Sequence, residues 1–110
     1  MPYTAFNARK SFIDKNPKII KNFTNAINKG LEFTKINSSK TIANAIIDQF
    51  PDTSLNDLIT IIERYKNADS WLDNPYITEK SFNNLQNIMI NDKQIKNYVP
   101  YKELINNAYE

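Results

Sequence analysis

One stretch of the sequence has the residue types and the spacing of a calcium-binding loop. Asp52, Ser54, Asn56, Thr60 and Glu63 stand where such a loop carries its oxygen ligands. The position at which the loop needs Gly for a sharp turn, however, is occupied by another acidic residue. Apolar residues also continue through the stretch at helical spacing, at positions 55, 58, 59 and 62. We therefore predict no metal site here, but a helix that opens with a variant of the capping box and has Ser54 as its N-cap.

Two carboxylates flank the single Trp of the chain. Asp69 and Asp73 lie on either side of Trp71, and Tyr76 follows shortly after them. Paired carboxylates can act as general acid and base when a cleft holds them together, and aromatic rings could stack on a planar ligand. The segment is irregular and contains Pro75, so we favour a solvated loop. In this interpretation Trp71 fixes the loop to the hydrophobic core.

The residue types that most enzymes use are otherwise missing. The 110 residues include no His and no Cys, which excludes nucleophiles activated by His within this chain. A zinc site would need carboxylates alone, which is unusual. The single Gly excludes a Gly-rich phosphate-binding loop and disfavours β-hairpins. We therefore predict that the chain is not an enzyme and binds no cofactor.

The formal net charge of +2 is unevenly distributed. Residues 1–40 carry eight basic and two acidic residues, whereas residues 41–110 carry six basic and ten acidic residues. A basic N-terminal third could contact the phosphates of a nucleic acid. Its lysines alternate with apolar residues at helical spacing and form no dense run. We therefore favour a solvated helix face and predict no nucleic-acid partner.

The spacing of apolar residues predicts an all-α fold. Helices are expected at about residues 9–15, 17–34, 39–50, 55–65, 79–89 and from 101 onward, with a turn or two over 93–98. Asn16, Ser38 or Ser39, and Thr78 are candidate N-caps, and prolines at positions 17, 51 and 100 mark further boundaries. These five to six short helices would form one compact domain over residues 1–110. Residues 3–8 alternate weakly and could add one short N-terminal strand.

Inward faces follow from the same spacing. In the second helix Ile20, Phe23, Ile27 and Leu31 recur at intervals of three and four residues, so they should face the core. In the fifth helix the expected inward residues are Phe82, Leu85, Ile88 and Met89.

Four short motifs occur in a characteristic order along the chain. The first is Ala8-Arg-Lys-Ser-Phe-Ile-Asp-Lys-Asn-Pro-Lys-Ile-Ile-Lys-Asn-Phe23. The others are Ala45-Ile-Ile-x-x-Phe-Pro51, Tyr65-x-x-Ala-Asp-x-Trp71 and Ile95-x-x-Tyr-Val-Pro100. Their order resembles the C-terminal part of the substrate-binding proteins of ABC transporters. The nearest group comprises binding proteins for sulfonates, nitrate, taurine or the pyrimidine precursor of thiamine.

The resemblance implies that residues 1–110 are the C-terminal helical part of a larger two-lobe fold, that of type II periplasmic binding proteins. Such proteins capture a small-molecule solute for import and deliver it to an ABC permease. They are lipid-anchored at the cell surface or periplasmic, although this chain carries no signal of its own and no apolar run suited to membrane insertion.

The resemblance also implies that most solute contacts come from upstream segments. The isolated chain is therefore expected not to bind the solute. Only Tyr3, Thr4 and Asn7 match the extended segment that approaches the hinge or cleft, so they are the candidate ligand-binding residues.

Two further expectations concern partners. A free-standing helical domain for protein–protein interaction is the alternative to a binding-protein segment. Helices that cover a sheet in the whole protein would expose apolar faces in this chain, and a homodimer is the simplest way to cover them.

Overall fold

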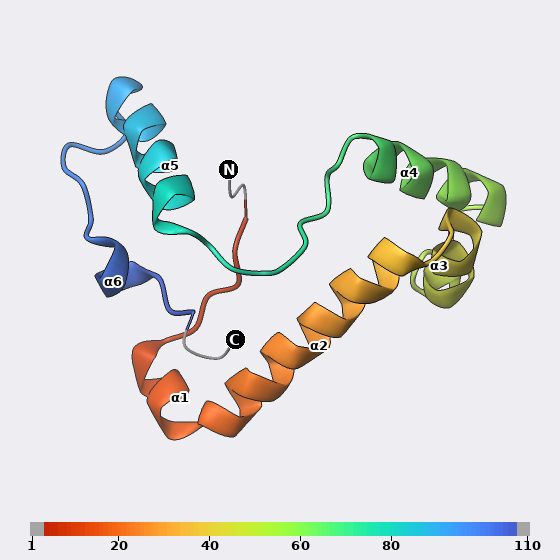
Figure 1. Ribbon diagram of the computed structural model, residues 1–110, viewed down its shortest axis with the longest axis horizontal. Coiled ribbons are helices and arrows are strands. Elements are labelled where there is room, and N and C mark those ends of the chain that lie inside the picture. The colour runs from red at the N-terminus through yellow and green to blue at the C-terminus, as the bar shows by residue number, and fades with distance from the viewer. Residues whose placement is uncertain (1–3, 108–110) are drawn as a thin grey trace. The chain divides into compact units, whose positions relative to one another are not determined.

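The computed structural model describes residues 4–107, which form six α-helices, one short 3-10 helix and no strand (Figure 1). The all-α prediction is therefore confirmed. Residues 4–8, where a short strand was allowed, have no regular structure, because a strand needs a second strand to pair with and none is described. The elements are α1 (Lys10–Lys15), α2 (Pro17–Ile36), α3 (Ser39–Ile46), η1 (Ile47–Gln49), α4 (Leu55–Asn67), α5 (Glu79–Asn91) and α6 (Tyr101–Leu104).

Hydroxyl side chains begin three of the helices, as their positions in the sequence predict. The hydroxyl oxygens of Ser38, Ser54 and Thr78 accept hydrogen bonds from the third backbone N–H of α3, α4 and α5, at 3.2, 3.1 and 3.1 Å. The Ser54 hydroxyl also donates to the Asp57 carboxylate at 2.7 Å, so two hydrogen bonds join Ser54 and Asp57 at the start of α4. Because α4 starts at Leu55, the stretch that resembles a calcium loop is a helix, as expected.

Asn16 separates α1 from α2, but its side chain acts on the preceding helix. Its amide Nδ2 donates to the carbonyl of Phe12 at 3.0 Å, which also accepts from the backbone N–H of Asn16 at 2.9 Å at the end of α1. The Asn16 carbonyl accepts the first backbone hydrogen bonds of α2, from Ile19 and Ile20, at 3.1 and 3.2 Å. Pro17 disfavours helical geometry at Asn16, so the chain changes direction there.

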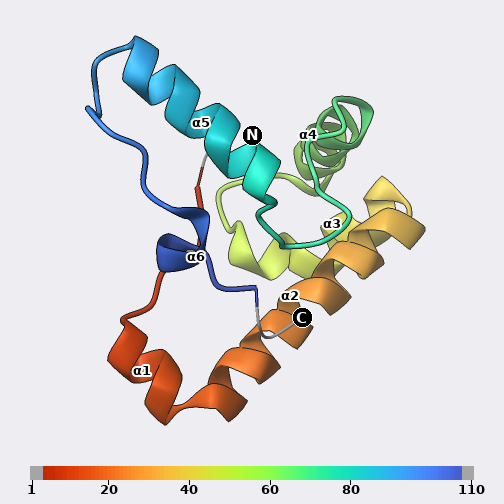
Figure 2. The ribbon, with the colours of Figure 1, turned by 60° about the vertical axis from the view of Figure 1, so that its left-hand side comes forward.

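The described residues group into two compact units. Unit 1 comprises residues 4–24 and 76–107, and unit 2 comprises residues 25–75. Helix α2 contributes residues to both units and runs without a break from Pro17 to Ile36 (Figure 2). No described helix is both long enough and apolar enough to cross a membrane.

Unit 2 has an apolar core between α3 and α4. Its four buried residues are at most 3% exposed, and they comprise two adjacent residues of α3 and two residues one turn apart in α4. Half-buried apolar side chains surround them, so each helix presents one apolar stripe to the other. The buried residues are Ile42, Ala43, Leu58 and Ile62, and the surrounding ones are Ile46, Ile47, Leu55, Ile59 and Trp71.

Unit 1 is built mainly around α5. Phe82 is buried and makes an edge contact with Tyr101 of α6, with ring centroids 6.0 Å apart. The other buried residue of α5 is polar, because Gln86 pairs with both backbone groups of Val99. The N-terminal arm contributes Phe6, whose ring meets that of Phe23 edge-on at 4.9 Å.

Some of the predicted inward positions are wrong. Phe23 is 44% exposed and Ile88 is 51% exposed, whereas Gln86 is 3% exposed. The loop after α5 explains the burial of Gln86, since its side chain pairs with the N–H and carbonyl of Val99, which an apolar side chain cannot do. Residues 93–98 form no helix.

Candidate functional site

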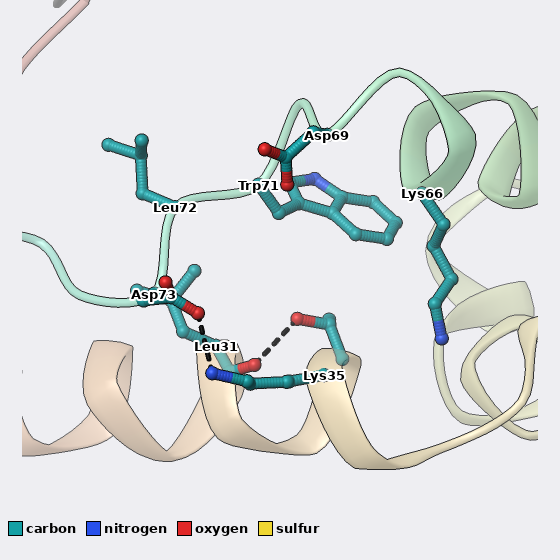
Figure 3. Close-up of a pocket in the computed structure, with 8 residues that line it drawn as sticks. Leu31, Lys35, Lys66, Asp69, Trp71, Leu72 and Asp73 are labelled. Carbon is teal, nitrogen blue, oxygen red and sulfur yellow. Dashed lines mark hydrogen bonds and ion pairs between the residues drawn. The ribbon is translucent and has the colours of Figure 1, made fainter.

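A small cavity in unit 2 brings several charged side chains together with the single Trp. It lies between the second half of α2 and the loop after α4, and its volume is about 200 Å³. Figure 3 shows Lys35 extending along α2 toward Asp73, with Trp71 and Asp69 on the loop above it. The lining residues are Leu31, Thr34, Lys35, Lys66, Asp69, Trp71, Leu72 and Asp73.

The end of α4 sets the direction of the loop that carries Trp71. The N–H of Ser70 bonds to the Tyr65 carbonyl at 3.0 Å, and the N–H of Asp69 bonds to the Lys66 carbonyl at 3.1 Å. These two bonds form a Schellman motif, which requires a left-handed residue just after the helix. Asp69 takes that conformation with φ of 50° although it is not Gly. The chain therefore turns back sharply and brings Trp71 toward the core.

Trp71 is a structural residue of this loop. Its ring stacks on that of Tyr65, with centroids 6.0 Å apart and an angle of 23° between the planes. Its side chain also packs against the buried core of unit 2. The prediction that Trp71 fixes the loop to the core is therefore confirmed, and one of its ring faces is already covered.

The two lysines of the cavity have partners. The ammonium group of Lys35 lies 2.6 Å from the Asp73 carboxylate, and the ammonium group of Lys66 donates to the Asn37 carbonyl at 2.6 Å. The hydrogen bond to Asp73, assisted by its charge, raises the pKa of Lys35, and the same contact lowers the pKa of Asp73. Both groups therefore stay ionised at neutral pH, and neither is suited to proton transfer.

The carboxylates of the cavity do not form a metal site. Among residues 4–107, no group of three or more His, Cys, Asp or Glu side chains is arranged to hold a metal ion. A second, shallower hollow of about 360 Å³ lies along α4 and is lined by Ile61, Arg64, Tyr65, Ala68 and Ser70. Its one charged residue, Arg64, has no carboxylate beside it among these residues, so the hollow lacks an acid–base pair.

The three candidate ligand-binding residues belong to the N-terminal arm. Tyr3 lies outside the described residues. Thr4 and Asn7 are exposed residues of unit 1, and the Asn7 amide donates to the carbonyl of Ala5 at 2.9 Å. The cavity of unit 2 includes neither of them. Their role in binding stays a prediction.

Two features of the cavity were not predicted from the sequence. Lys35 and Asp73 are 38 residues apart, and no local pattern marks such a pair. Lys66 was one of several lysines on helices, and its contact with Asn37 depends on how α4 meets the end of α2 within unit 2.

Comparison with known proteins gives one relative. The chain is 38% identical over 106 residues to a protein of Bacillus subtilis (strain 168) described as "Putative binding protein YtlA". The alignment covers 96% of this chain and 32% of YtlA, so the chain spans about a third of the length of that relative. No family model matches the chain, and no solved structure gives a significant match. The chain is thus homologous to one segment of YtlA.

Proposed function

We propose that this chain is the C-terminal helical segment of a solute-binding protein of an ABC importer, and that it does not hold the solute by itself. The observation that carries the proposal is the 38% identity to YtlA, which extends over 96% of this chain. The order of the four sequence motifs supports the same parent family. In the whole protein the solute would be a small molecule, the partner an ABC permease, and the location the cell surface or the periplasm.

The cavity of unit 2 supports the second half of the proposal. Its volume of about 200 Å³ is below the ~300–1,000 Å³ of usual small-molecule sites, and the 360 Å³ hollow along α4 is shallower, with Arg64 as its one charged lining residue. Lys35 and Lys66 have partners, and Trp71 is used to anchor the loop. A solute would therefore find few free polar groups in this cavity, so its main contacts would come from other parts of the binding protein.

A segment exchange tests the proposal. The segment of YtlA that aligns with this chain would be replaced by residues 1–110, and the chimera would be compared with native YtlA. The ligand panel would contain taurine, an alkanesulfonate, nitrate and a thiamine pyrimidine precursor, and binding would be measured by calorimetry. We expect the chimera to unfold cooperatively and to bind whatever native YtlA binds, with affinity within about tenfold (~1.4 kcal/mol).

Two controls accompany this experiment. A chimera with Leu58→Asp places a charge in the core of unit 2, where Leu58 is 3% exposed, and it should fail to fold. The free 110-residue chain should give no binding heat with the same panel. A free chain that binds a panel member with micromolar affinity would contradict the proposal, as would a chimera that stays unfolded while native YtlA folds.

A further inference from the structure

The N-terminal part of unit 1 carries an excess of positive charge. Residues 4–24 contain five basic residues and one acidic residue, whereas residues 25–75 contain five basic and seven acidic residues. Asp14 is paired with Lys10 at 3.0 Å, so the other four cations of residues 4–24 form no ion pair within the part of the chain that the structure describes. All four are exposed, and they are Arg9, Lys15, Lys18 and Lys21.

Three exposed apolar side chains lie in the same segment, and we call them the arm patch. Ile19 and Phe23 are one turn apart on α2, so they lie on the same side of that helix. Phe6 belongs to the N-terminal arm, and its ring meets the ring of Phe23 edge-on at 4.9 Å. The exposures of Phe6, Ile19 and Phe23 are 72%, 54% and 44%. The three side chains therefore form an open apolar surface and not a part of the core.

The arm patch changes the interpretation of the charge. Lysines beside a covered apolar face would be ordinary solvated residues, as the sequence spacing indicated. Within the fold, however, α2 turns a different side inward. Ile20 and Thr24 are half-buried, and each is one residue, or about 100° around the helix, away from a member of the patch. The apolar patch and the unpaired cations are therefore exposed together, so that one partner could contact both.

An anionic membrane surface is the partner that uses both features. Its phosphate groups attract lysine and arginine, and its interfacial region accepts the exposed aromatic and aliphatic side chains. A nucleic-acid duplex would also attract the cations, but it would leave the apolar side chains in water. The combination of basic and aromatic side chains on one exposed segment therefore favours the membrane.

The cations do not have to lie beside the arm patch to contribute. Lys18 is one residue, or about 100°, from Ile19, whereas Lys21 is two residues, or about 200°, from it and lies on the far side of α2. A helix with its side chains is only ~10–12 Å across, which is close to the Debye length of ~8–10 Å at moderate salt. The attraction between Lys21 and a charged surface is therefore only partly screened when the patch faces that surface.

We propose that residues 4–24 form a docking surface for a membrane that contains anionic phospholipids. The arm patch enters the interfacial region, and α2 lies along the surface while the unpaired cations attract the phosphate groups. The contact is peripheral, because it uses one side of a helix and one side chain of the arm. This inference does not depend on the proposed role in solute import.

The two parts of the interaction respond differently to lipid and salt. Each basic residue near an anionic surface strengthens binding about fivefold at low salt, and added salt screens this attraction. We therefore expect the chain to bind vesicles of equal parts phosphatidylglycerol and phosphatidylcholine, and to bind vesicles of phosphatidylcholine alone at least about tenfold more weakly. Most of the bound protein should be released by about 0.5 M NaCl. Equal binding to both kinds of vesicle would contradict the proposal.

Vesicle co-sedimentation of two matched double variants tests the role of the charges. Lys18→Gln with Lys21→Gln removes two unpaired cations of unit 1 and should weaken binding at least about tenfold. Lys40→Gln with Arg64→Gln removes two exposed cations of unit 2, from α3 and α4, and should weaken it much less. Both variants have the same net charge. Equal losses would show that only net charge matters, and this result would overturn the assignment to residues 4–24.

A second pair of variants tests the arm patch. Phe23 and Phe50 have nearly equal exposures, 44% and 45%, but Phe50 follows η1 in unit 2. We expect Phe23→Ser to weaken binding to the anionic vesicles several-fold and Phe50→Ser to leave it unchanged. Phe6→Ser should act like Phe23→Ser, and because Phe6 lies outside every helix, circular dichroism should show no loss of helix. Unchanged binding by both Phe6→Ser and Phe23→Ser would contradict a role for the patch.

Single cysteines that carry an environment-sensitive fluorophore test the orientation of α2, because the chain contains no Cys of its own. Ala26 follows Phe23 by three residues and lies on the same side, whereas Asn25 is two residues, or about 200°, from Phe23. A label at Ala26→Cys should shift its emission to the blue when anionic vesicles are added, and a label at Asn25→Cys should shift much less. Equal shifts at the two positions would contradict docking through the patch.

Two results with the unlabelled wild-type chain would overturn the proposal directly. One is the absence of binding to the anionic vesicles at low salt. The other is tighter binding to a DNA duplex than to these vesicles, with no effect of Phe6→Ser, which would assign the basic segment to a nucleic acid.

Discussion

Each of the two units is stabilised internally by a different kind of interaction. In unit 2, two helices bury apolar residues that are at most 3% exposed, including Ile42 and Leu58. In unit 1, the segment after α5 is attached largely through hydrogen bonds. Gln86 pairs with both backbone groups of Val99, and the carbonyl of Ile77 accepts from the Tyr101 hydroxyl and the Asn107 amide.

The difference shows how the cost of a substitution depends on the type of contact. Removing part of an apolar side chain leaves a cavity, whose cost grows with the volume lost. Removing one partner of a buried hydrogen bond leaves the other without a replacement, and the cost is then that of desolvation. Unit 2 should therefore be most sensitive to side-chain volume, and unit 1 to the loss of particular donors and acceptors.

The largest expected effect is in the core of unit 2. Ile62→Ala should lower the free energy of unfolding by about 2–4 kcal/mol, because Ile62 is 2% exposed between α3 and α4. The neighbouring Ile61 is 41% exposed, so Ile61→Ala should cost less than about 1 kcal/mol. Urea unfolding followed by circular dichroism measures both. Equal losses would contradict the assignment of the core.

Gln86 should give the largest effect in unit 1. Gln86→Leu keeps the volume but leaves the N–H and carbonyl of Val99 without their partner, which should cost about 1–3 kcal/mol. Gln86→Glu can still accept from the N–H of Val99, but it sets a carboxylate against the Val99 carbonyl at a position that is 3% exposed, so it should not restore the stability at neutral pH.

Hydrogen exchange identifies the cause of this loss. The amide of Val99 should exchange much faster in Gln86→Leu than in the wild type. Asn84→Ala, at an exposed position of the same helix, is the control and should leave this rate unchanged. Unchanged protection of Val99 in Gln86→Leu would show that the side chain does not hold the segment.

In each unit a stabilising substitution is expected at the left-handed residue that follows the C-terminal end of a helix. Helices α4 and α5 each end in a Schellman motif with a left-handed residue other than Gly, Asp69 with φ of 50° and Lys93 with φ of 58°. Asp69→Gly and Lys93→Gly should each raise the free energy of unfolding by about 0.5–1 kcal/mol, since Gly adopts this conformation without strain. Asn84→Gly, at an exposed position in the middle of α5, should have the opposite sign. Thermal unfolding measures the effect: the first two variants should melt at a higher temperature than the wild type, and the third at a lower one.

The smallest expected effect concerns the exposed ion pair of unit 2. The contribution of the Lys35–Asp73 pair to the free energy of unfolding is fully present above the ordinary pKa of Asp, 3.8. It is lost as the pH falls through the lowered pKa of Asp73. It is also present below the ordinary pKa of Lys, 10.5, and is lost as the pH rises through the raised pKa of Lys35. Because both groups are exposed, the effect should be small and should shrink further with added salt.

Asp73→Asn measures this contribution. The melting temperatures of the variant and the wild type should differ slightly at neutral pH and low salt, and they should converge in acid. A difference that persists below the pKa of Asp73 would show that the side chain acts through packing and not through its charge.

The sequence predicted those parts of the fold that depend on near neighbours. The caps Ser38, Ser54 and Thr78 could be identified because each acts on a backbone group only three residues away. The anchoring role of Trp71 was also predicted, since Pro75 and the flanking carboxylates indicated a loop beside a core. For the same reason the apparent calcium loop could be assigned to a helix from the sequence alone.

Other features depend on contacts that sequence spacing does not encode. The burial of Gln86 depends on the path of residues 92–100, and the contact between Lys35 and Asp73 depends on the turn after α4. The exposure of Phe23 was missed because periodicity identifies an apolar helix face without showing whether anything covers it. The candidate site could therefore be predicted only through Asp69, Trp71 and Asp73.

The position of Trp71 has a practical consequence for spectroscopy. It is the only Trp of the chain, and it is stacked on Tyr65 within unit 2. Its fluorescence will therefore report the state of unit 2, whereas circular dichroism reports the helices of both units. Transitions that coincide in the two signals would indicate that the units unfold together, and separate transitions would reveal a state in which only one unit is folded.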